Sequence, residues 1–176
     1  MDFDDGAWPR FKGPVPAGTR EIALLALRGK FMVADPARAG QLRLSLGFRG
    51  GAVVYVNGRE VARSHLPAGA LQPLTCAEDY PKEAYLNPEG FVLRRGFGDP
   101  RTYADRFRLR RRDLNDVRIP AKLLRKGVNV LAVEIVRAPY DPVVVEKAPD
   151  PGKQPLYRSG ALGWNTCQIL SIRLSA

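Results

Sequence analysis

The sequence predicts an all-β domain, an antiparallel β-sandwich with long loop insertions. Six to nine short segments have strand-like patterns, and no long amphipathic helix accompanies them. Hydrophobic residues make up 45% of the 176 residues, which is enough for a sizeable core. The 17 glycines and 15 prolines exceed the ordinary combined share of about 12% and indicate many turns. This length fits a single domain over residues 1–176.

The first strands are predicted by their hydrophobic patterns. Residues 21–33 are apolar enough for one long strand or two short ones. Residues 35–40 predict a single helical turn that ends at a glycine. Residues 41–48 alternate strictly between polar and apolar side chains, which is typical of a strand with one buried face.

A β-hairpin follows. Two β-rich runs, residues 52–56 and 59–63, flank the dipeptide Asn57-Gly58. A type I′ turn needs positive φ at both of its central residues, and Asn-Gly meets that need best. We therefore interpret Asn57 as a turn residue rather than a ligand.

The second half of the chain predicts one short turn and two further strands. Residues 119–124 have proline early in a short helical turn, and residues 129–136 predict a central strand. Residues 167–174 alternate again and form the last predicted strand.

Two long segments have no regular pattern. They are residues 67–116, with one short helix expected near 79–86, and residues 138–163. Loops of this length are more often functional than accidental. The part from about 70 to 116 is the main predicted insertion.

Positive charge is concentrated in one part of the chain. Residues 94–126 hold 12 Lys and Arg against 4 Asp and Glu, which is +8 of the net +10. In the arginine-rich segment, residues 106–112, the first five residues alternate Arg with Phe or Leu. On a strand, this pattern places the guanidinium groups on one face, where they could bind phosphate, sulfate or uronate. The alternative is a solvated face, or a surface that meets an acidic neighbouring domain.

The residue inventory argues against an enzyme. The single histidine, His65, has no Gly-x-Ser-x-Gly motif to accompany it, and a zinc site would require it to meet both cysteines. Asp113 and Asp116 lie among arginines, which suits neither of them to be a general acid. We expect no catalytic residue. Cys76 and Cys167 are 91 residues apart, and free thiols are the favoured interpretation over a disulfide.

No stretch of about 18 apolar residues occurs, so no membrane span is predicted. The N-terminus is acidic, where a signal peptide would be basic and then apolar. Such a start suggests a domain cut from a longer chain. Asp2, Asp4 and Asp5 could bind a structural calcium ion, although a frayed acidic terminus is the simpler interpretation.

Three segments together carry a family pattern. Residues 51–63 run strand, Asn-Gly, strand, and residues 119–134 run short turn, Gly-x-Asn, apolar strand. Residues 3–8 place Trp8 near the start, where it is expected to pack. In this order they resemble the galactose-binding-like β-sandwich (jelly-roll) domains that accompany bacterial glycoside hydrolases. The resemblance implies a jelly roll, carbohydrate binding and an exported bacterial protein. The basic stretch from about 70 to 116 departs from the family.

Loop aromatics and arginines are the candidate ligand-binding residues. Aromatic rings can stack on sugar rings, and arginines can hydrogen-bond hydroxyl or acidic groups. Each tyrosine could instead anchor its own loop. The candidates are Trp164, Tyr80, Tyr85, Tyr140, Arg94, Arg95, Arg108 and Arg110.

These observations predict a non-catalytic accessory module that binds carbohydrate, and an acidic glycan suits the arginines better than a neutral one. The alternative is a structural or protein-interaction module that docks on a neighbouring domain through the arginine-rich segment. Nucleic acid is not an expected partner, because no RNP, KH or zinc-finger spacing occurs. No cofactor is expected apart from the calcium considered above.

Overall fold

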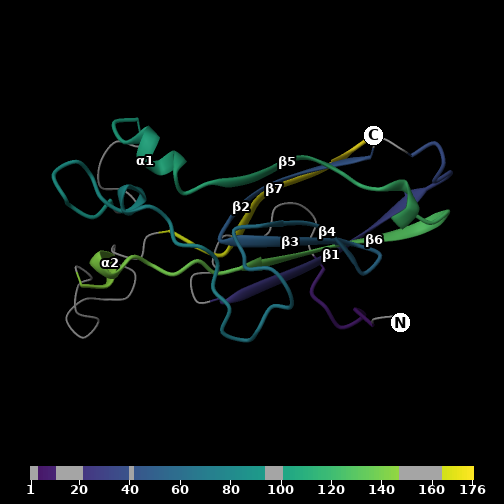
Figure 1. The fold of residues 1–176 in the computed structure, drawn as a ribbon, viewed down its shortest axis with the longest axis horizontal. Helices are drawn as coiled ribbons and strands as arrows, with labels where there is room; N and C mark the ends of the chain where they lie inside the picture. Colours follow the sequence, from purple (N-terminus) through teal and green to yellow (C-terminus); the bar gives the residue numbers. More distant parts are fainter. Residues whose placement is uncertain (1–3, 11–21, 40–41, 94–100, 147–163) are drawn as a thin grey trace.

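The computed structural model describes residues 4–10, 22–39, 42–93, 101–146 and 164–176. It shows two antiparallel β-sheets, one of four strands and one of three, packed face to face (Figure 1). The predicted all-β sandwich is confirmed. No helix within these ranges is long and apolar enough to cross a membrane.

The four-stranded sheet has the spatial order β1-β6-β3-β4. Its strands are β1 (Leu24–Val33), β6 (Gly127–Val136), β3 (Gly51–Val56) and β4 (Arg59–Ser64). β6 pairs with both β1 and β3, which confirms the predicted central strand. Residues 24–33 form one long strand rather than two.

The three-stranded sheet has the order β5-β2-β7. β2 (Arg43–Arg49) lies between β5 (Arg112–Arg118) and β7 (Gln168–Ser175). The alternation seen in the sequence around 41–48 turns Leu44, Leu46 and Phe48 into the sandwich, where all three are buried. They share one core with the inward side chains of the other sheet, including those of Val54, Val56, Val133 and Ile135.

The β3–β4 hairpin has the predicted turn, with φ of 50° at Asn57 and 78° at Gly58. The Asn57 amide donates to the Leu123 carbonyl at 2.8 Å and to the Asn129 side chain at 2.8 Å. Leu123 closes the short helix η2 (Ala121–Leu123), which matches the turn predicted over 119–124. Asn57 therefore fixes the hairpin turn to the start of β6.

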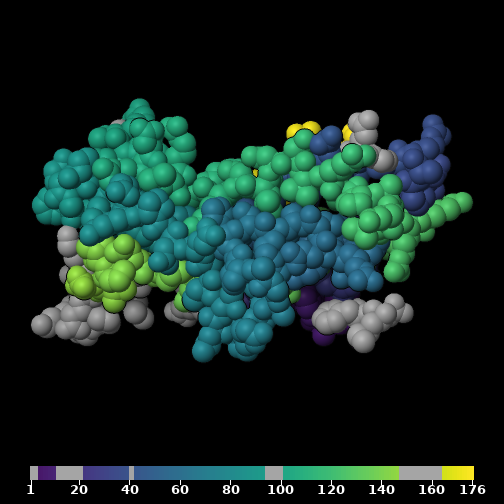
Figure 2. All heavy atoms as spheres, in the orientation of Figure 1, coloured from purple at the N-terminus to yellow at the C-terminus, as the bar shows by residue number. Residues whose placement is uncertain are grey.

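The long insertion folds into a small lobe at one end of the sandwich (Figures 1 and 2). We call this lobe the annex and define it as residues 75–93, 101–111 and 137–146 with Trp164. It contains η1 (Lys82–Ala84), which confirms the short helix expected near 79–86, and also α1 (Ala104–Arg108) and α2 (Pro142–Glu146). A second hydrophobic cluster, separate from the sandwich core, fills its interior.

The start of the arginine-rich segment is helical, so the strand geometry considered for its alternating pattern does not occur. Residues 104–108 form α1, with a hydrogen bond from the Phe107 amide to the Tyr103 carbonyl at 3.0 Å, and β5 begins only at Arg112. A period-two pattern over five residues is too short to exclude a helical turn. The guanidinium groups therefore do not share one strand face. The helix α2 was not predicted either.

Candidate functional site

The structure brings the four predicted aromatic residues together as the core of the annex. The Trp164 ring centroid lies 5.0 Å from that of Tyr80, 5.4 Å from that of Tyr85 and 6.4 Å from that of Tyr140. Tyr80, Tyr85 and Trp164 are 4%, 1% and 7% exposed. A sugar ring can stack only on an exposed aromatic face, and these three rings are covered by other side chains. Each tyrosine hydroxyl also bonds to the backbone of another segment.

Arg110 is part of this core. Its guanidinium carbon lies 4.7 Å from the Trp164 ring centroid and 4.5 Å from the Phe107 centroid. It donates to the carbonyls of Ala84 at 2.8 Å and Leu93 at 3.0 Å. Burial lowers the pKa of Arg110 to about 10. In this position Arg110 holds η1 and the chain after it against the annex core.

Arg112 ties the annex to the sandwich. The buried guanidinium lies 4.0 Å from the Tyr80 ring centroid and donates to the carbonyls of Gly50, Glu78 and Asp79. Burial lowers its pKa, and the nearby Tyr80 and Glu78 oppose that shift. The Gly50 amide in turn donates to the Tyr80 hydroxyl at 2.8 Å.

The other arginines of residues 106–112 also have partners inside the molecule. Arg106 donates to the Leu86 carbonyl at 2.7 Å, Arg108 pairs with Asp105 at 2.8 Å, and Arg111 pairs with Asp113 at 2.7 Å. The arginine-rich segment therefore stabilises the annex and forms local ion pairs. Arg94 and Arg95 lie outside the described residues.

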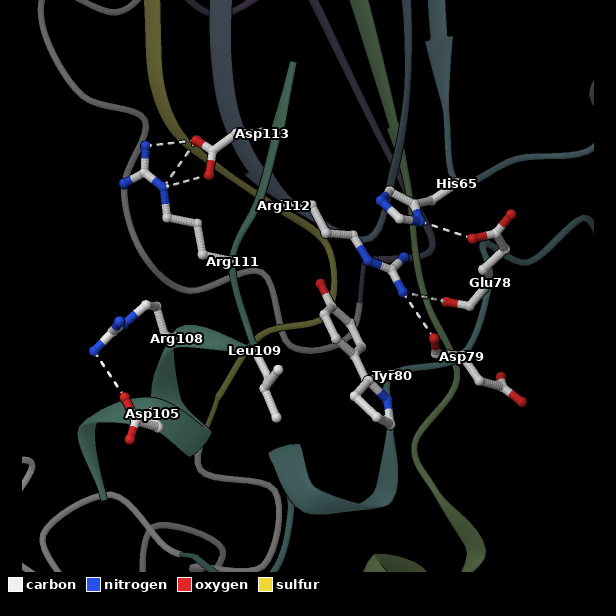
Figure 3. A pocket seen from close by; sticks show the side chains of 11 residues that line it. His65, Glu78, Asp79, Tyr80, Asp105, Arg108, Leu109, Arg111, Arg112 and Asp113 are labelled. Atoms are coloured by element: carbon white, nitrogen blue, oxygen red, sulfur yellow. Dashed lines mark hydrogen bonds and ion pairs between the residues drawn. The ribbon is translucent and has the colours of Figure 1, made fainter. Parts of the chain in front are cut away.

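A cleft of about 710 Å³ opens where the annex meets the sandwich (Figure 3). It lies between the end of β4, the chain before η1, α1 and the start of β5. Two ion pairs and one histidine–carboxylate hydrogen bond lie around it, and Figure 3 shows each as a dashed line. They are Arg108 with Asp105, Arg111 with Asp113, and His65 Nδ1 with Glu78 Oε2 at 2.7 Å.

Charge in the cleft is nearly balanced. The lining includes three arginines and four carboxylates, with His65 beside them. Arg108 and Asp105 have side chains 74% and 92% exposed, so their charges are available to a ligand. Exposed ion pairs contribute only about 0–1 kcal/mol to stability, so a ligand group can replace one partner at low cost. The cleft therefore presents donors and acceptors side by side.

Most of these cleft residues were not predicted. His65 was interpreted as an ordinary strand-end residue, and Glu78 had no pattern that marked it. His65 adopts a left-handed backbone with φ of 55° directly after β4, which turns the chain toward Glu78. Of the predicted ligand-binding candidates, Tyr80 and Arg108 line the cleft, and Asp113 was considered only as a general acid.

The acidic N-terminus does not form a cation site among the described residues. Asp4 accepts a hydrogen bond from the Gly6 amide at 2.8 Å, and Asp5 pairs with Arg10 and Arg28. Burial by itself raises the pKa of Asp5. The hydrogen bond from Arg10 and the neighbouring positive charges together outweigh burial, so the pKa of Asp5 is below its ordinary value. Asp2 lies outside the described residues, and the described ones contain no cluster of three metal-ligating side chains.

Both cysteines are free, as predicted. Cys76 is exposed at the start of the annex, whereas Cys167 is buried in the sandwich core. Burial raises the pKa of Cys167 to about 11.

No family model and no curated protein matches the chain. Among solved structures, a β-D-mannosidase from Dictyoglomus thermophilum aligns with 74% of this chain at 15% identity and a TM-score of 0.28. A β-glucuronidase from an uncultured Clostridium species aligns with 71% at 20% identity and a TM-score of 0.29. The chain spans only 10% and 16% of those two proteins. Likenesses of this strength do not assign a function to the chain.

Proposed function

We propose that this chain is a non-catalytic carbohydrate-binding accessory module, and that the cleft beneath the annex is its ligand site. Carbohydrate polymers are found mainly outside the cell, so the same proposal places the parent protein among exported bacterial proteins.

The observation that carries the proposal is the ring of exposed, charge-balanced ion pairs around the cleft. A sugar hydroxyl both donates and accepts, so it suits a surface where guanidinium and carboxylate groups alternate. Arg111 and Asp113 form such a pair through two arginine nitrogens, and Arg108 and Asp105 form another. Because the charges nearly cancel, a neutral polyhydroxylated ligand fits this cleft better than a polyanion. This revises the preference for an acidic glycan drawn from the arginine count.

The pairing of the cleft carboxylates supports the non-catalytic part of the proposal. Glycoside hydrolysis needs one carboxyl group to donate a proton and another to act as base or nucleophile. Two of the cleft carboxylates accept hydrogen bonds from arginines, Asp105 from Arg108 and Asp113 from Arg111. The third, that of Glu78, shares a hydrogen bond with His65. That arrangement suits them to accept hydrogen bonds from ligand hydroxyls.

Isothermal titration calorimetry against neutral and acidic oligosaccharides tests the proposal. The key variant is Asp113→Asn, which removes a charged acceptor from the cleft. A hydrogen bond to a charged group contributes about 1.5–3 kcal/mol, so we expect the affinity for a bound neutral oligosaccharide to fall about tenfold or more.

Glu60→Gln is the matched control. Glu60 also forms a two-point ion pair with an arginine, Arg63, at 2.7 and 2.9 Å, but neither residue lines the cleft. We expect this variant to bind like the unchanged chain. Equal weakening by both substitutions, or no saccharide binding to the unchanged chain, would contradict the proposal.

A second candidate function, docking on a neighbouring domain, is favoured by exposed apolar side chains on the annex. Phe91, Leu109 and Val145 are 69%, 41% and 62% exposed, and all three belong to the annex. Apolar residues of this size at a surface are a common feature of interfaces. If the annex docks, a fluorescent probe of apolar surface should bind the isolated chain and not the longer parent protein. Equal binding to both would reject docking.

A further inference from the structure

A second hollow, which we call the sheet groove, lies on the outer face of the four-stranded sheet. It has a volume of about 800 Å³. Strand register brings Arg28, Ala132 and Tyr55 into one row across β1, β6 and β3, and Lys30 pairs with Val130 in the next row. Side chains two apart on a strand share a face, so these rows line the groove. Ala132 and Val130 are the shorter side chains of these two rows and also line the groove.

Two aromatic side chains line the groove. Tyr55, from β3, donates its hydroxyl to Glu134 on the neighbouring β6 at 3.2 Å. Trp8 comes from the N-terminal segment, where its amide donates to the Asp5 carbonyl at 3.1 Å. Asp5 is tied to β1 through its ion pair with Arg28 at 3.1 Å. Both rings are half-buried, so part of each remains available to a ligand.

The cations of the groove differ from those of the cleft. Lys30 and Arg125 are exposed, and among the described residues neither side chain forms an ion pair or a hydrogen bond. Lys30 acts only at longer range, on the charge of Asp5. The backbone of Arg125 is fixed, because its amide and carbonyl both bond to the Asn129 side chain, at 2.8 and 2.7 Å. Two exposed cations without a short-range partner favour an anionic ligand.

We propose that the sheet groove binds an anionic carbohydrate, a sugar chain that carries carboxylate or sulfate groups. Its acidic group lies against Lys30 and Arg125, its ring packs on Tyr55 or Trp8, and Glu134 accepts a hydroxyl hydrogen bond at the other side. A DNA strand fits less well, because it offers no free sugar hydroxyl for the Glu134 carboxylate to accept a hydrogen bond from. No residue of the groove belongs to the cleft, so this inference does not rest on the proposed function.

The test is a binding titration at low and at physiological salt with four probes: polygalacturonate, dextran sulfate, neutral dextran and oligo-dT. The Asp113→Asn chain, whose cleft is weakened, should bind at least one acidic polysaccharide at physiological salt, and neutral dextran at least tenfold more weakly. Preference for polygalacturonate identifies a carboxylate ligand and preference for dextran sulfate identifies a sulfate ligand. Both results support the proposal. Tightest binding to oligo-dT, or binding that disappears at physiological salt, would overturn it.

The variant Lys30→Ala/Arg125→Ala should lose at least tenfold in affinity for the acidic polysaccharide. Its matched control is Arg38→Ala/Lys82→Ala, which removes the same two charges from exposed positions outside the groove. An equal loss of affinity in both double variants would show that only the net charge matters, and would contradict the proposed site. Tyr55→Leu should also weaken binding, whereas Asp113→Asn in the cleft should leave it unchanged. The groove variants and the cleft variant therefore report on the two proposed sites separately.

Discussion

The annex and the sandwich build their interiors in different ways. The sandwich core is mainly aliphatic and lies between two sheets whose backbone hydrogen bonds are satisfied by neighbouring strands. The annex core combines the aromatic rings of Tyr80, Tyr85 and Trp164 with small aliphatic side chains, and the guanidinium groups of Arg110 and Arg112 are packed against these rings. Buried arginine therefore distinguishes the annex: Arg110 lies inside it, and Arg112 at the start of β5 packs against it from the sandwich.

The difference follows from the short helices of the annex. A helix of three to five residues leaves most of its carbonyl groups without a partner in the helix itself. An arginine offers five N–H donors on a long arm, so it can satisfy carbonyls from several segments at once. Arg112 does so at three carbonyls and Arg110 at two. Arginine side chains can thus stabilise a region with little regular secondary structure by donating to its backbone carbonyls.

The largest effect is expected at Gly50, where the two regions meet. Its φ is 97°, and a Cβ there would overlap the Val136 carbonyl oxygen and lie 2.7 Å from that of Thr166. We expect Gly50→Ala to lower the free energy of unfolding by about 4 kcal/mol, measured by urea denaturation. Gly58→Ala is the control, because φ is 78° there but no atom lies within 4 Å of the new Cβ. It should cost about 1 kcal/mol. Similar losses in the two variants would show that the junction tolerates a side chain.

Arg110→Ala should produce the next largest effect. It removes a charged donor from two buried carbonyls and the packing between two rings, and we expect a loss of about 3 kcal/mol in unfolding free energy. Tryptophan fluorescence during denaturation will report it, because Trp164 contacts the guanidinium. A loss below about 1 kcal/mol would mean that Arg110 does not support the annex.

The two thiols compare the regions directly. With a disulfide reagent at pH 8, Cys76 of the annex should react rapidly and Cys167 of the sandwich core only after unfolding. The Cys167 pKa of about 11 lies above its ordinary value of 9.0, so the folded state holds that proton more tightly than the unfolded state. The resulting stability is complete below pH 9 and is lost as the pH rises through 11. Cys167→Ala should show a smaller fall in stability over this range. Rapid labelling of both thiols at pH 8 would contradict the buried position.

The smallest effect is expected for Arg108→Ala. Arg108 belongs to the same arginine-rich segment as Arg110, but its side chain is 74% exposed and its ion pair with Asp105 joins residues three apart. We expect a change of less than about 0.5 kcal/mol in thermal or urea denaturation. A loss as large as that of Arg110→Ala would remove the distinction between buried and exposed arginines.

Six of the strands could be predicted from the sequence because the signals for each one are local, whereas β5 lies largely in the segment 67–116 that was interpreted as irregular. Residues 41–48 alternate, and Asn57-Gly58 prescribes its own turn geometry. The annex could not be predicted in this way. Arg110 reaches carbonyls 17 and 26 residues away, and Arg112 reaches one 62 residues away, so their burial depends on contacts that no local pattern records. The cleft was missed for the same reason, since His65, Glu78, Asp105 and Asp113 meet only after the annex folds.

Amide hydrogen exchange on Arg110→Ala, compared with the unchanged chain, tests the central claim that buried arginines hold the annex in place. The account predicts faster exchange in residues 82–93 and 104–109, with protection retained in β2, β3 and β6. Unchanged exchange in the annex, or equal acceleration in those strands, would contradict it.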